Sequence, residues 1–80
     1  MDVSATIDRI LINTCKVDKH KLGDPGIGLK QLDLDSLAIL EAIFEIETEF
    51  DIELEDEQLS GLRSVSDLIA AVHTQLHKTT

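Results

Sequence analysis

Ser36 is the side chain whose type and position point most directly to chemistry. It follows Asp35, a residue type that caps helices because its carboxylate accepts a free backbone N–H of the first turn. A serine in that first turn lies near unpaired N–H groups and the positive end of the helix dipole, where a phosphodiester is favoured. The position alone also fits a serine that only starts the helix. The surrounding sequence must decide between these two interpretations.

Acidic residues are concentrated after Ser36. The segment 33–57 holds no Lys, Arg or His and contains eleven acidic residues: Asp33, Asp35, Glu41, Glu45, Glu47, Glu49, Asp51, Glu53, Glu55, Asp56 and Glu57. Like charges at i, i+4 destabilise a helix by about 0.2–0.5 kcal/mol per pair, so a helix selected only for stability would mix signs. The ladder Glu41, Glu45, Glu49 therefore indicates a docking surface for a basic partner, with a merely solvated face as the alternative.

Composition and charge narrow the class of protein. The chain has 80 residues, a net charge of −9 and 42% hydrophobic residues. Such a charge repels nucleic acid and anionic lipid surfaces. Cys15 is the only cysteine, so an internal disulfide is excluded. No signal-peptide pattern is visible, and no apolar stretch approaches the roughly 18 residues of a membrane span. We expect a cytoplasmic protein without stable membrane insertion, built as a single domain over residues 1–80.

Hydrophobic periodicity predicts the elements that position Ser36. The segment 2–16 carries Val3, Ile7, Ile10, Leu11 and Thr14 at helical spacing, with Asp2 or Ser4 as its cap. Three glycines and the only proline make residues 23–28 a loop. We expect the loop to pack against the helices through Leu22, Ile27, Leu29 and Leu32. A second helix should start at Asp35-Ser36 and end near Phe50.

The last third predicts two further helices. Residues 51–54 alternate in polarity but are too few for a sheet, so we interpret them as a connector between helices. A short helix is expected over 56–62, ended by Gly61. Ser64 and Asp67 form a capping box before a final helix with Val65, Leu68, Ile69, Val72 and Leu76 on one face. The predicted fold is all-α: three main helices plus one short helix, with a long loop between the first two.

The order of these features resembles the acyl carrier protein family. The resemblance rests on Leu32-Asp33-Leu34-Asp35-Ser36-Leu37, on the acidic helix after it, and on Phe50-Asp51-Ile52-Glu53-Leu54. Asp56-Glu57, Ser64-Val65 and the last amphipathic helix follow in the family's order, so the resemblance covers nearly the whole chain. It implies a carrier bundle that is not an enzyme.

The resemblance also implies roles for residues. Ser36 would receive 4′-phosphopantetheine from coenzyme A, and the thiol of that arm would carry acyl groups as thioesters. Asp35 and Leu37 would belong to the motif read by a phosphopantetheinyl transferase. Partner enzymes with basic docking faces, whether acyl-transferring, condensing or ligase enzymes, would bind a monomer through Glu41, Glu45, Glu47 and Glu49. An acyl chain would lie in the interior, lined by Leu40, Ile43, Phe44, Ile46, Leu62 and Ile69.

Departures from the family pattern leave the cargo open. Asp33 stands where glycine is frequent, Ala38 where a polar residue is frequent, and Glu55 where proline is frequent. A fatty acid pathway and a specialised acyl or polyketide pathway both remain. An aminoacyl or peptidyl carrier is a rival, although such carriers usually lack an acidic residue before the serine. An unmodified acidic interaction module is another.

Other candidate chemistry is weaker. A serine hydrolase would need a Gly-x-Ser-x-Gly turn or its equivalent, and none surrounds Ser36. His73 and His77 are spaced i, i+4 but lack a third ligand, so no metal site is predicted. Cys15 is interpreted as structural.

Overall fold

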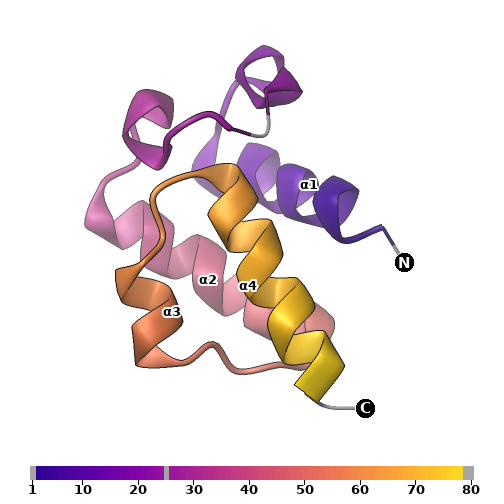
Figure 1. Ribbon diagram of the computed structural model, residues 1–80. Helices are drawn as coiled ribbons and strands as arrows, with labels where there is room; N and C mark the ends of the chain where they lie inside the picture. The colour runs from indigo at the N-terminus through magenta and orange to yellow at the C-terminus, as the bar shows by residue number, and fades with distance from the viewer. Residues whose placement is uncertain (1, 25, 79–80) are drawn as a thin grey trace.

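The protein is a helical bundle in a computed structural model that describes residues 2–24 and 26–78. Figure 1 shows α1 (Val3–Cys15), α2 (Ser36–Phe50) and α4 (Val65–Lys78) packed around one interior. The short α3 (Asp56–Ser60) comes between α2 and α4 in the chain and lies at one side of the bundle. No strand is present within those residues. The predicted all-α architecture of three main helices plus one short helix is confirmed.

The connection between α1 and α2 is more ordered than the glycine pattern predicted. It contains two 3-10 helices, η1 (Lys19–Gly23) and η2 (Leu29–Leu32). Leu29 and Leu32 are buried in the core, and Leu22 and Ile27 pack against it, so the predicted anchoring of the loop is confirmed. Pro25, part of the predicted loop, lies outside the described residues.

Local caps set the ends of α1 and α2. The Asp2 carboxylate accepts the Ala5 N–H at 3.1 Å, and the Asp35 carboxylate accepts the Ala38 N–H at 2.8 Å. Each helix ends where one residue adopts the left-handed conformation: Lys16 after α1, with φ 60°, and Asp51 after α2, with φ 53°. These bounds agree with the sequence prediction because side-chain capping depends on near neighbours.

The connector after α2 is fixed by side chains from two helices. Glu47 of α2 accepts the Leu54 N–H at 2.9 Å, and the buried Gln75 of α4 donates to the Glu53 carbonyl at 2.6 Å. Ile52 and Leu54 turn into the core. The segment therefore forms no strand, as predicted. The short helix α3 then ends at Ser60 with Gly61 as its C-cap, two residues before the predicted limit.

Backbone hydrogen bonds join the loop to the start of α4. The Leu29 N–H donates to the Arg63 carbonyl at 2.9 Å, and the Val65 N–H donates to the Ile27 carbonyl at 3.1 Å. The predicted capping box is present: Asp67 accepts the Ser64 N–H and its own N–H donates to Ser64 Oγ, each at 3.2 Å. These bonds hold the chain before α2 against the chain before α4.

The Asp67 cap gives a first prediction. Asp67→Ala removes a carboxylate that accepts the backbone N–H groups of both Arg63 and Ser64. We expect the free energy of unfolding to fall by about 0.5–2 kcal/mol, the usual range for loss of a capping side chain at a helix start. Urea denaturation of the wild-type protein and the variant measures this change in the free energy of unfolding. His73→Ala, at an exposed position of the same helix, should change stability little, and equal losses in both variants would contradict the assignment.

Candidate functional site

Ser36 lies on the surface at the first residue of α2. Asp35, Ser36 and Leu37 are all exposed, so the hydroxyl is open to a macromolecular partner. The Asp35 cap satisfies the Ala38 N–H. Among the described residues, the N–H groups of Ser36 and Leu37 have no partner, as expected at a helix start. The structure therefore combines an accessible hydroxyl with the positive end of a 15-residue helix.

Cys15 ties the end of α1 to the start of α2. Its Sγ–H donates to the Ala38 carbonyl at 3.3 Å, two residues beyond Ser36. Burial raises the pKa of the half-buried Cys15 thiol, and the Glu41 and Asp35 carboxylates raise it further. The thiol is therefore held in its protonated, less nucleophilic form.

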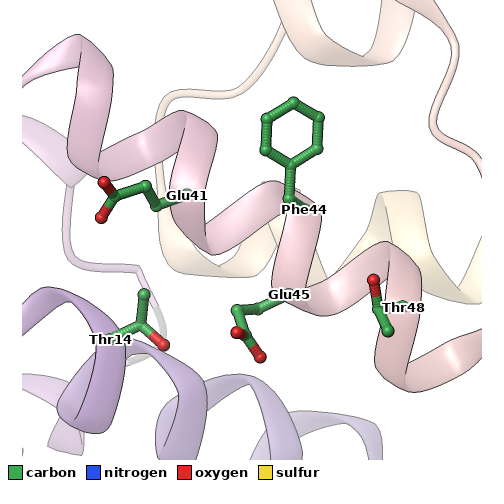
Figure 2. A pocket seen from close by; sticks show the side chains of 5 residues that line it. All are labelled: Thr14, Glu41, Phe44, Glu45 and Thr48. Atoms are coloured by element: carbon green, nitrogen blue, oxygen red, sulfur yellow. The ribbon is translucent and has the colours of Figure 1, made fainter.

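Three of the four predicted docking glutamates, Glu41, Glu45 and Glu49, are exposed, and Glu47 is half-buried. Glu41 and Glu45 line a shallow groove of about 370 Å³ between α1 and α2, together with Thr14, Phe44 and Thr48. Figure 2 shows both carboxylates on the side of α2 that faces α1, while the Phe44 ring projects away from α1. Glu41 and Glu45 carry no ion-pair partner in the described part of the chain.

Glu47 and Glu49 have bonds within the protein. The Arg9 guanidinium of α1 lies 2.8 Å from Glu49 Oε1, so the expectation of a ladder without nearby positive charge is wrong at this position. The two partners are 40 positions apart in the sequence, so the sequence pattern did not reveal this pair. An exposed pair contributes roughly 0.2–1 kcal/mol, so it remains breakable. Glu47 is half-buried and bonded to the Leu54 N–H.

Apolar side chains lie beside these carboxylates. Leu37, Leu40 and Phe44 are the exposed large hydrophobic residues, at 64%, 48% and 64% exposure. Leu40 and Phe44 were predicted to lie in the interior, and that placement is wrong. The apolar arc of α2 is wider than the face that α1 and α4 cover, which is filled by Ala42, Ile43, Ile46 and Phe50. The three exposed residues, here called the apolar stripe, are spaced i, i+3 and i+7 on one face.

The interior holds a narrow apolar cavity. Its lining is Leu11, Leu29, Leu34, Ile39, Ala42, Ile43, Leu62 and Leu68, and its volume is about 10 Å³. Of the predicted lining, Ile43 and Leu62 are present, whereas the buried Ile46 and half-buried Ile69 lie elsewhere in the core. A cavity needs about 10–15 Å³ to admit one water. An acyl chain does not fit without movement of the surrounding helices.

The described residues, 2–24 and 26–78, form neither a cluster of metal ligands nor a membrane-spanning helix. No group of three or more His, Cys, Asp or Glu side chains is arranged to hold a metal ion. His73 and His77 are exposed on α4. None of the helices formed by those residues is long and apolar enough to cross a membrane.

Known proteins share this sequence and fold. A family model described as "Phosphopantetheine attachment site" matches residues 5–72. An acyl carrier protein of Exiguobacterium sp. is 40% identical over 78 residues, covering 89% of this chain and 99% of that protein. An acyl carrier protein of Helicobacter hepaticus is 25% identical over 72 residues, covering 90% and 95%. The crystal structure of an acyl carrier protein from Thermotoga maritima matches with a TM-score of 0.83 at 29% identity, covering 95% and 88%.

The family match over most of the chain and the shared fold define a phosphopantetheine-attachment domain. The chain belongs to the acyl carrier protein family. The cofactor of this family is 4′-phosphopantetheine, and its members are carriers, not enzymes.

The environment of Cys15 gives a second prediction. Because the thiolate is the reactive form, a raised pKa moves the pH midpoint of alkylation upward. In protein without phosphopantetheine, the midpoint of iodoacetamide modification should lie above that of a cysteine peptide measured alongside. Glu41→Gln removes a neighbouring negative charge and should move the midpoint down, whereas Glu53→Gln should not. A midpoint equal to the peptide's would contradict the assigned environment.

Proposed function

We propose that residues 1–80 act as a single, monomeric acyl carrier domain with 4′-phosphopantetheine attached to Ser36. The observation that carries this proposal is the exposed Ser36 hydroxyl at the capped start of α2. It stands in Asp35-Ser36-Leu37, inside the segment that the phosphopantetheine family model matches. When bound, the arm supplies a thiol that carries acyl groups as thioesters.

The residues around Ser36 fit a phosphodiester. Attachment breaks the O–H bond of Ser36, whose proton is released, and joins Ser36 Oγ to the pantetheine-bearing phosphorus of coenzyme A. The pyrophosphate bond of coenzyme A breaks, and 3′,5′-ADP leaves. The N–H groups of Ser36 and Leu37 and the dipole of α2 favour the resulting negative charge. The Asp35 carboxylate is bonded to Ala38, so its role is to fix the helix start. The exposed Leu37 offers an apolar contact to the transferase.

The docking face in this proposal has an ionic and an apolar part. Glu41 and Glu45 attract basic partner surfaces, and the apolar stripe next to them gains free energy when a partner covers it. Glu49 can also contact a partner once its ion pair with Arg9 breaks. Glu47 contributes negative charge to the docking face while its carboxylate accepts the Leu54 N–H. The partners are a phosphopantetheinyl transferase and acyl-transferring, condensing or ligase enzymes of a fatty acid or specialised acyl pathway.

Attachment to Ser36 is tested by intact mass. Incubation of the protein with a phosphopantetheinyl transferase, Mg²⁺ and coenzyme A should add one phosphopantetheine. Ser36→Ala should gain nothing while remaining folded, because the replaced hydroxyl is exposed and makes no described hydrogen bond with another side chain. No gain in wild type with several transferases of different specificity would favour an unmodified interaction module instead.

The salt dependence of KM distinguishes the ionic contribution to docking from the apolar contribution. With the transferase as partner, Glu41→Gln/Glu45→Gln should raise KM by about three- to ten-fold at low salt, and the difference should shrink as salt screens the charges. Phe44→Ala should raise KM at every salt concentration, because apolar contacts are not screened.

The matched control is Asp56→Asn/Glu57→Gln, which removes two negative charges at exposed positions on α3. If net charge alone guides docking, this control will behave like the α2 double variant. A KM independent of salt in wild type would contradict the ionic part of the docking face.

A further inference from the structure

A groove adjoins the narrow apolar cavity, and one of its lining residues, Ile39, lies about one helical turn after Ser36. It has a volume of about 550 Å³ and is lined by Gly28, Leu29, Lys30, Ile39, Leu62 and Arg63. Leu29, Ile39 and Leu62 also line the closed cavity. The groove is therefore the outer mouth of that cavity, and it has the room that the interior lacks.

The groove lies next to the point where the arm is attached, so an arm that folds back along α2 can place its cargo there. Ile39 follows Ser36 by three residues, and side chains at this spacing share one helix face with Cβ atoms about 5–6 Å apart. The apolar floor formed by Leu29, Ile39 and Leu62 can cover a short methylene chain. In the described conformation a short cargo would therefore lie in the groove, because the cavity beneath admits about one water.

The rim of the groove carries two positive charges. The chain has 7 Lys and Arg residues against 16 Asp and Glu, yet Lys30 and Arg63 both line this one groove. The hydrogen bond from the Leu29 N–H to the Arg63 carbonyl, at 2.9 Å, holds the two segments together. Asp67 lies nearby, but its carboxylate accepts backbone N–H groups of residues 63 and 64.

Neither positive charge is neutralised by an acidic side chain of the described structure. The ion pairs among residues 2–24 and 26–78 are Arg9–Glu49, Lys21–Asp33 and Lys78–Glu55. Lys30 and Arg63 therefore remain available to an anion, beside an apolar floor. This combination matches a ligand that is apolar along its length and negative at one end.

We propose that the groove holds acyl cargo that ends in a carboxylate, as in a short dicarboxylic acyl group. The proposal rests on the proposed attachment at Ser36 and specifies the class of cargo. The methylene segment covers the apolar floor, and the terminal carboxylate lies between Lys30 and Arg63. A simple fatty acyl chain leaves both cations without a partner, and the ammonium of an aminoacyl group is repelled by them.

Free thioesters test the groove without the attachment step. Adipyl-pantetheine and hexanoyl-pantetheine have acyl groups of equal length and differ in whether a carboxylate or a methyl ends the chain. Each is titrated into unmodified protein while backbone amide NMR shifts are followed. We expect adipyl-pantetheine to bind on the order of five-fold more tightly than hexanoyl-pantetheine, which is the affinity gain that two exposed ion pairs provide. The shifts should centre on residues 29, 30, 39 and 63, and the advantage should shrink between roughly 0.05 and 0.5 M salt.

Variants assign the advantage to the two cations. Lys30→Gln/Arg63→Gln should remove the preference for adipyl-pantetheine and keep the affinity for hexanoyl-pantetheine. Arg63→Lys should retain most of the preference. Lys16→Gln/Lys19→Gln removes the same total charge at exposed positions that do not line the groove and should keep the preference in full.

Several results would overturn this proposal. They are equal affinity of wild type for the two thioesters, no saturable shift at the groove with either compound, or loss of the preference in the Lys16→Gln/Lys19→Gln control. A failure of the proposed carrier function would be recognised by a different result: the wild-type protein would gain no phosphopantetheine at Ser36 in the mass experiment.

Discussion

The packing of three helices around one set of buried side chains determines what the rest of the surface presents. The side chains that lose almost all contact with water are Ile7, Leu11, Ile46, Val65 and Val72, from α1, α2 and α4. Because Ile46 must face inward, the rotation of α2 about its axis is fixed. A domain of this size buries only roughly 60–65% of its unfolded surface, so no further element covers the other side of α2. Leu40 and Phe44 are exposed for this reason.

Features that depend on near neighbours were predictable from the sequence. The starts of α2 and α4 follow from the Asp35 and Asp67 caps, and both were placed to within a residue. The buried face of α1 follows from its helical spacing. The exposed position of Ser36 follows from its place in the first turn of α2, which is itself set by the cap.

Features that depend on distant residues were not predictable. Hydrophobic periodicity shows which residues of α2 share a face, but not which part of a wide apolar arc its neighbours will cover. Leu40 and Phe44 were misplaced for that reason. The Arg9–Glu49 pair and the bond between Leu29 and Arg63 join segments far apart in sequence. Only the fold brings Lys30 and Arg63 to one groove.

The fold separates negative and positive charge into two regions that suit different ligands. Glu41 and Glu45 lie exposed on α2, where a protein surface can reach them along with the apolar stripe. Lys30 and Arg63 border a groove near the start of the same helix. With attachment at Ser36, a partner enzyme would meet the negative face while the cargo lies against the positive groove. Docking and cargo retention would then use different side chains, and each could be altered separately.

The closed cavity limits how a longer cargo can be sheltered. Its volume is that of about one water, so any chain that enters must displace an element of the wall. The short helix α3 has five residues and none is buried, whereas each long helix buries at least four. Elements with few buried apolar contacts open at the lowest free-energy cost. Leu62, which follows α3 and borders both the cavity and the groove, would move with it. Because α3 itself contributes no residue to the cavity lining, a cargo on the Ser36 arm would enter only where Leu62 or another wall residue moved, since the folded interior provides almost no volume in advance.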